Sequence, residues 1–130
     1  MKLKQTFFTI LIGLVLLLNF ACKKEAEPTS NPTASNNLAN TWSRTFDTIP
    51  VNLIFKSDNS YQVNAMGITI ESGTYTKTTS SVTVTATFGD CSTFTGNYNY
   101  IISGSNILFN QVNDGCDKRI LAIPGNWIKQ

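Results

Sequence analysis

A strict alternation of polar and apolar side chains over residues 81–88, with the sequence SVTVTATF, is the feature that most constrains the fold of this chain. Successive side chains of a β-strand point to opposite faces of the sheet, so this pattern is typical of a strand with one buried and one solvated face. Most residues of the segment are β-branched or aromatic, which are the types enriched in strands. The segment therefore predicts a half-buried strand.

Similar runs fill the chain from residue 41 to its end, and short groups of Gly, Asn, Asp and Ser separate them. These connections are short enough to join antiparallel neighbours, and helical spacing is not kept for more than about one turn. We therefore expect an all-β domain, an antiparallel up-and-down meander of about eight strands. The expected strands are residues 41–46, 51–56, 60–65, 68–77, 81–88, 93–103, 106–112 and 118–123, with residues 127–129 as a short tail.

A second pattern indicates how this sheet curves. A small residue, a polar residue and a large aromatic residue follow one another at four places, as NTW at 40–42, GTY at 73–75, GNY at 96–98 and GNW at 125–127. A glycine inside a strand permits a sharp bend or a bulge. Bends at regular intervals curl a sheet until its first and last strands meet, so we expect a closed barrel.

The N-terminus has the three parts of a signal peptide, with two early lysines, an apolar stretch and the small Ala21 before Cys22. The apolar stretch, residues 7–20, is shorter than the roughly twenty residues that a membrane-spanning helix needs. Residues 18–22 resemble the lipobox of bacterial lipoproteins. This resemblance implies a signal peptide over residues 1–21, cleavage before Cys22, and a lipid on its thiol that anchors the chain to a membrane.

The residue after Cys22 is Lys23, whereas lipoproteins kept in the inner membrane resemble one another in an aspartate there. The resemblance therefore implies the outer membrane of a Gram-negative cell envelope. A plain secretory signal with a stray cysteine is the alternative, and it would give a soluble secreted protein.

The chain after the anchor divides into a tether, residues 22–38, and one small domain, residues 39–130. Residues 25–37 contain two prolines and no large apolar side chain, so burial there cannot offset the entropy cost of ordering. Within the domain, basic and acidic side chains balance. A nucleic-acid surface needs clustered Lys and Arg, so nucleic acid is not an expected partner.

The chain has three cysteines and no histidine, and this limits its chemistry. If Cys22 carries lipid, Cys91 and Cys116 remain as a pair in an oxidising compartment, and we predict a disulfide between them. The alternatives are free thiols or a metal site, but two sulfurs without histidine are too few for four-coordinate zinc. No Ser–His or Cys–His nucleophile is available, so we expect a non-enzyme without a cofactor.

A family resemblance rests on Trp42 and Arg119. Trp42, preceded by residues 39–41, resembles the Gly-x-Trp signature that opens lipocalins and their calycin relatives, and Arg119 resembles the arginine that those barrels stack against that tryptophan. Residues 113–119, with the sequence NDGCDKR, resemble the ending of small bacterial lipocalin-like lipoproteins. The resemblance implies a small lipocalin-like barrel that a contact between Trp42 and Arg119 closes. An open β-sandwich with Arg119 on its surface is the alternative.

Two function classes follow from these expectations. In the first, the barrel binds a small hydrophobic molecule; in the second, it is filled, and its loops, such as residues 46–50 and 88–92, bind an envelope protein as an accessory or inhibitor. An enclosed cavity of about 300 Å³ or more would favour the first class. The candidate ligand-lining residues, which would be ordinary core in a filled barrel, are Phe55, Tyr61, Val63, Tyr75, Val84, Tyr98, Tyr100 and Phe109.

Overall fold

The computed structural model describes residues 37–130. The predicted signal peptide, the lipidation site at Cys22 and nearly all of the tether lie outside the described residues. Within the described part of the chain, no helix has the length and apolar character needed to cross a membrane.

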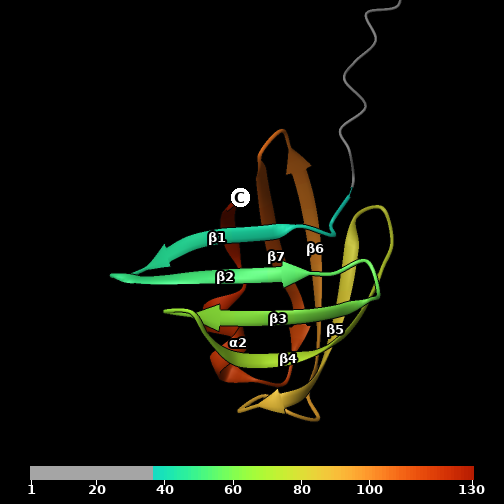
Figure 1. Ribbon diagram of the computed structural model, residues 1–130. Helices are drawn as coiled ribbons and strands as arrows, with labels where there is room; N and C mark the ends of the chain where they lie inside the picture. Colours follow the sequence, from blue (N-terminus) through green and yellow to red (C-terminus); the bar gives the residue numbers. More distant parts are fainter. Residues whose placement is uncertain (1–36) are drawn as a thin grey trace, which may run out of the picture. The chain divides into compact units, whose positions relative to one another are not determined.

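Eight antiparallel strands form a meander that closes into a barrel (Figure 1). Each strand pairs with its neighbours in sequence, and the first also pairs with the last, with Trp42 opposite Lys129. The prediction of an all-β up-and-down barrel is confirmed, and the open sandwich is wrong. The strands are β1 (Thr41–Phe46), β2 (Ile49–Phe55), β3 (Ser60–Ala65), β4 (Ile68–Lys77), β5 (Ser81–Gly89), β6 (Thr95–Ser103), β7 (Asn106–Asp114) and β8 (Gly125–Lys129).

A short helix, α2 (Asp117–Ala122), lies between β7 and β8. The strand expected at residues 118–123 is therefore wrong, and the expected tail at 127–129 belongs to the true last strand. The helix contains Lys, Arg, Leu and Ala, which are good helix formers, and it begins with an acidic residue in its first turn. Six residues are too few for an apolar period to distinguish a helix from a strand.

Bulges bend the sheet near two of the predicted glycines. The register shifts between Ser72 and Gly73 and again between Asn97 and Tyr98, next to Gly96. A β-carbon at Gly73 would meet the carbonyl oxygen of Thr85 at 2.0 Å, so only glycine allows the two backbones to approach this closely there.

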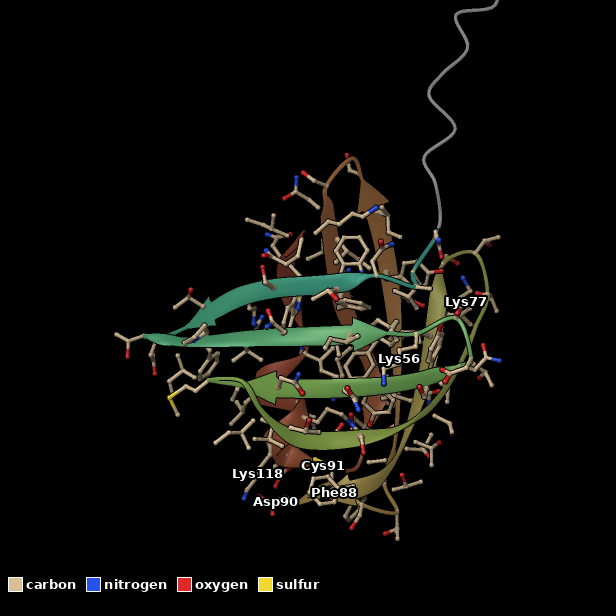
Figure 2. All side chains as sticks on the ribbon, viewed as in Figure 1. Lys56, Lys77, Phe88, Asp90, Cys91 and Lys118 are labelled. Atoms are coloured by element: carbon tan, nitrogen blue, oxygen red, sulfur yellow. A yellow bond between two sulfur atoms is a disulfide. The ribbon has the colours of Figure 1, made fainter. Side chains whose placement is uncertain are left out.

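The up-and-down topology gathers alternate connections at opposite ends of the barrel. The α2 end, as we call it, contains α2 and the connections at residues 47–48, 66–67 and 90–94; the tether end contains residues 37–40, 56–59, 78–80 and 104–105. Figure 2 shows Lys56 and Lys77 toward the tether end, and Asp90, Cys91 and Lys118 together at the α2 end.

Packed side chains fill the barrel interior and close the tether end. Leu38 is fully buried there, and its carbonyl oxygen accepts a hydrogen bond of 3.0 Å from the indole Nε1 of Trp42. The hydroxyl groups of Tyr75 and Tyr100 donate to turn carbonyls at the same end, at 2.7 and 2.8 Å. All eight predicted ligand-lining side chains belong to this one core cluster.

Candidate functional site

An apolar pocket of about 190 Å³ lies at the α2 end, above the filled interior. The last inward-facing residues of four adjacent strands form its wall, and α2 covers one side. Three of the lining side chains, Phe46, Ile49 and Ile70, are between 39% and 48% exposed, so the pocket opens to solvent. The lining residues are Arg44, Phe46, Ile49, Val51, Val63, Ala65, Ile70 and Ala122.

The local sequence explains why this end is hollow. Trp42, on β1, is fully buried, but the side chains that follow it on the same face, Arg44 and Phe46, are progressively more exposed. Opposite them, the small side chains of Ala65 and Ala122 reach only a short distance into the barrel end. Space therefore remains between the last full layer of the core and α2.

Arg44 is the one charged residue that lines this apolar pocket. Its guanidinium donates a 2.7 Å hydrogen bond to the carbonyl oxygen of Pro124 and another to that of Ala122. Its Cζ atom lies 4.6 Å from the centre of the Trp127 ring, within the range of a cation–π contact. Burial lowers the pKa of Arg44 from its ordinary value, because the apolar surroundings disfavour the charged form.

This stack corrects the predicted closure contact. Arg44 on β1 lies over Trp127 on β8, so a guanidinium–indole pair does join the first and last strands. The predicted partners are wrong, because the side chain of Arg119 forms ion pairs with acids at the α2 end and the indole of Trp42 donates to Leu38.

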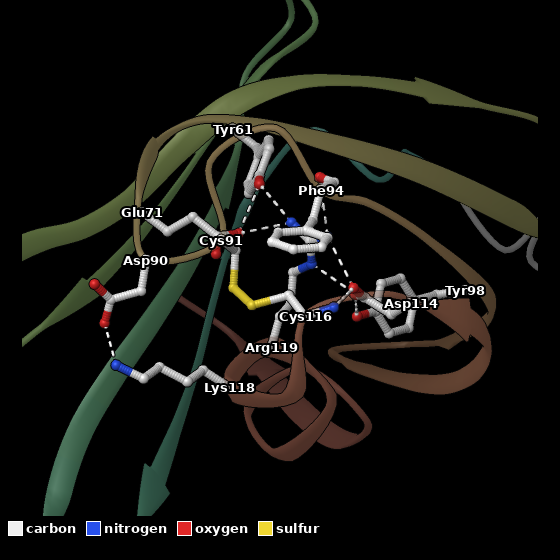
Figure 3. The surroundings of a disulfide bond; sticks show 10 residues. All are labelled: Tyr61, Glu71, Asp90, Cys91, Phe94, Tyr98, Asp114, Cys116, Lys118 and Arg119. Atoms are coloured by element: carbon white, nitrogen blue, oxygen red, sulfur yellow. Dashed lines mark hydrogen bonds and ion pairs between the residues drawn. A yellow bond between two sulfur atoms is a disulfide. The ribbon is translucent and has the colours of Figure 1, made fainter.

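Arg119 lies at the centre of a buried ionic network beside the apolar pocket (Figure 3). Its side chain is 1% exposed, and its Nε and Nη2 atoms donate to the two carboxylate oxygens of Asp114, at 2.6 and 2.9 Å. Its Nη1 atom lies 3.4 Å from Oε1 of Glu71, and Nη2 also donates to the carbonyl oxygen of Phe94. The network thus ties α2 to β4, β7 and the β5–β6 connection.

Two tyrosines complete the network. The hydroxyl of Tyr61 donates to Glu71 at 2.6 Å, and that of Tyr98 donates to Asp114. Burial, followed by the adjacent carboxylates, raises the pKa of both tyrosines far above the ordinary range, so both stay neutral donors. Every buried side-chain nitrogen and oxygen in the described part of the chain has a hydrogen-bond partner. The arrangement is that of a satisfied structural network.

The predicted disulfide between Cys91 and Cys116 is confirmed (Figure 3). It links the β5–β6 connection to the residue before α2, with 5.5 Å between the two Cα atoms. A second pocket of about 100 Å³ borders Cys91, Arg119 and the exposed ion pair of Asp90 with Lys118. It shares Val63, Ile70 and Ala122 with the apolar pocket, so the two pockets adjoin.

The structure corrects the predicted ligand-lining residues. Of the eight, only Val63 borders either of these two pockets, and the other seven fill the core beneath them. Phe46 and Ile49 do line the apolar pocket; both belong to residues 46–50, predicted as a contact loop, and the structure places them at the end of β1 and the start of β2. Sequence reasoning missed Arg44, although its position two residues after Trp42 on β1 places a cation on the inner face.

No protein-family model, curated protein or solved structure matches this chain. The function is therefore inferred from the geometry of the site.

Proposed function

We propose that this chain is a membrane-anchored lipoprotein, and not an enzyme, whose lipocalin-like barrel binds a small apolar molecule in the pocket at the α2 end. The observation that carries the proposal is the apolar pocket with its solvent-exposed mouth. In this proposal Cys22 bears the lipid, and the outer membrane of a Gram-negative cell holds the anchor.

The size of the pocket limits the ligand. The interior of the described barrel is packed, so it does not supply the enclosed cavity of about 300 Å³ or more that would favour a ligand inside it. The proposed site is instead the open pocket of about 190 Å³ above that core. A short alkyl chain, or the end of a longer one entering from the mouth, fits that space better than a fused-ring molecule. Each methylene group buried there contributes about 0.8 kcal/mol to binding, before the entropy cost of association.

The position of the pocket suits an anchored protein. The tether joins the barrel at Leu38, at the tether end, and the pocket opens at the other end of the same strands. The pocket mouth and the residues that lead into β1 are therefore at opposite ends of the barrel.

Binding of octanol, measured by isothermal titration calorimetry, tests the proposed function. We expect Ala122→Trp to abolish binding, because the larger side chain fills the pocket that Ala122 lines. Ile101→Trp is the matched control: Ile101 is 63% exposed on β6 and lies outside the pocket, so its variant should bind as the unsubstituted protein does. Failure of the unsubstituted protein to bind octanol, or equal binding by Ala122→Trp, would contradict the proposal.

A protein-binding role is the second candidate, because three large apolar side chains at the α2 end do not line the pocket. Met66, Ile68 and Leu121 are 66–70% exposed. Exposed apolar groups around a pocket mouth are typical of protein-interaction sites. If this role holds, Met66→Ser with Leu121→Ser should prevent capture of an envelope protein while octanol affinity stays unchanged.

A further inference from the structure

Among residues 37–130, the guanidinium of Arg44 has no acidic partner. Its two hydrogen-bond acceptors are the carbonyl oxygens of Pro124 and Ala122, which carry no net charge. The ion pairs found within residues 37–130 belong to Lys118 and Arg119. Arg44 is half-buried against apolar side chains, and no carboxylate among the described residues balances its positive charge.

Three acids at the α2 end are already engaged in ion pairs with other cations. Both Asp114 and Glu71 contact Arg119, and Asp90 pairs with Lys118. Asp47 follows Phe46 in the exposed β1–β2 turn and forms no ion pair with Arg44. The positive charge in the pocket is therefore free to pair with an anion from outside the described residues.

The unused donors of Arg44 favour an anion of a particular shape. A guanidinium has five N–H donors at its planar edge, and the two backbone acceptors leave donors available. The Cζ atom of Arg44 lies 4.6 Å from the centre of the Trp127 ring and 5.6 Å from that of Phe46, so aromatic contacts also hold this side chain at the pocket. A guanidinium with unused N–H donors recognises the paired oxygens of a carboxylate.

We propose that the pocket takes a free monocarboxylate with a short alkyl tail, whose head group pairs with Arg44 and whose tail packs against Val51, Val63 and Ala65. This inference rests on the proposed function, and it adds the charge and the head group of the ligand. The positive charge complements the head group, and the apolar lining of the pocket complements the tail.

Three probes with the same tail test the head group: octanoate, octanol and octylammonium. Calorimetric titration of the full chain at neutral pH should give an affinity for octanoate at least about tenfold higher than for octanol, because a charge-assisted hydrogen bond is stronger than a neutral one. Octylammonium should bind more weakly than octanol, since its charge repels that of Arg44. Octanol binding as tight as octanoate binding, with both lost in Ala122→Trp, would overturn the carboxylate proposal and leave the proposed function standing.

Substitution of Arg44 is the second test of the carboxylate proposal. Arg44→Gln should lower the affinity for octanoate about tenfold more than it lowers the affinity for octanol, whereas Lys129→Gln, at an exposed cation on β8, should change neither affinity. The unfolding temperature of each variant shows whether it folds, and if Arg44→Gln does not fold, the probe series on the unsubstituted protein decides. Unchanged octanoate affinity in folded Arg44→Gln would overturn the carboxylate proposal. If none of the three probes binds the unsubstituted protein, the proposed function and the carboxylate proposal both fail.

Discussion

Two inward-facing arginines at the same end of the barrel have opposite surroundings. Arg119 contacts two carboxylates and the hydroxyl of Tyr61, whereas Arg44 contacts two backbone carbonyls and two aromatic rings. Burial alone would lower the pKa of Arg119, but the hydrogen bonds and charges of Asp114 and Glu71 raise it overall. No carboxylate among residues 37–130 pairs with Arg44, and burial lowers its pKa. Arg119 therefore has a structural role, whereas in the proposal above Arg44 pairs with a ligand.

Replacement of Arg119 should be strongly destabilising. Arg119→Met removes the cation and leaves Asp114 and Glu71 buried without it, which should lower the free energy of unfolding by about 3–5 kcal/mol. Urea unfolding measures this difference. Lys118→Met, one residue away, breaks an ion pair whose side chains are 74% and 72% exposed, so little change is expected. Equal stability of the two variants would contradict the structural role of Arg119.

Acid should lower the free energy of unfolding in part by protonating Asp114. Burial alone would raise the pKa of Asp114, but hydrogen bonds from Arg119, Tyr98 and the Cys116 amide outweigh it, and the pKa is lowered. A depressed pKa in the folded state stabilises the protein above the unfolded-state value of about 3.9, and the contribution disappears as pH falls through the folded value. The stability difference between the unsubstituted protein and Asp114→Asn should therefore shrink between about pH 5 and pH 2, as chemical denaturation can measure. A difference independent of pH would contradict this role.

At the residue level, the sequence predicts the kind of closure contact but not its partners. The lipocalin resemblance implied that Arg119 stacks on Trp42, whereas the structure stacks an arginine of the first strand on a tryptophan of the last. A match of short motifs does not determine which of two arginines reaches an indole ring. The side chain of Arg119, on α2, pairs with Asp114. The residues that do form the stack are Arg44 and Trp127, on β1 and β8.

At the level of elements, the strands could be predicted because their side chains alternate. In β5 the buried positions are Val82, Val84 and Ala86, as the period of two requires. The same periodicity fails for α2, which is short and makes its decisive contacts through one buried arginine. The pocket was missed for a related reason: alternation identifies which side chains face inward but not how far the core fills the barrel.

The disulfide should stabilise the α2 end. Cys91 and Cys116 are 25 residues apart, and closing a loop of that length stabilises a fold by on the order of 3 kcal/mol in the chain-entropy model. The double variant Cys91→Ala with Cys116→Ala should lose about that much stability in urea unfolding. In the unsubstituted protein, Cys91 and Cys116 should resist alkylation under denaturing, non-reducing conditions, because their sulfurs are bonded to each other. Free thiols under those conditions, or an equally stable double variant, would contradict this prediction.

At the level of the whole molecule, the residues that lead into β1 and the apolar pocket lie at opposite ends of the barrel. Leu38 and the hydroxyls of Tyr75 and Tyr100 close the tether end, whereas the disulfide, the Arg119 network and the two pockets lie at the α2 end. Between the two ends, the inward-facing side chains fill the core. Each strand forms hydrogen bonds with its two neighbours around the closed barrel. If Cys22 carries the proposed anchor, we expect its substitution to change the membrane association of the protein without changing the affinity of the pocket for octanol.

Substitution of Cys22 tests this separation together with the proposed anchor. In cells fed an alkyne analogue of palmitate, the unsubstituted protein should take up the label and sediment with membranes, and Cys22→Ser should do neither, because serine lacks the thiol that accepts the lipid. The variant should still bind octanol with unchanged affinity, since the pocket is lined by residues between Arg44 and Ala122, far along the chain from Cys22. Ala21→Ser, which keeps the thiol and a small residue before it, is the matched control and should retain the label. Labelling of Cys22→Ser would place the lipid on another residue, and an unlabelled unsubstituted protein would favour the plain secretory signal, with the barrel released from the membrane.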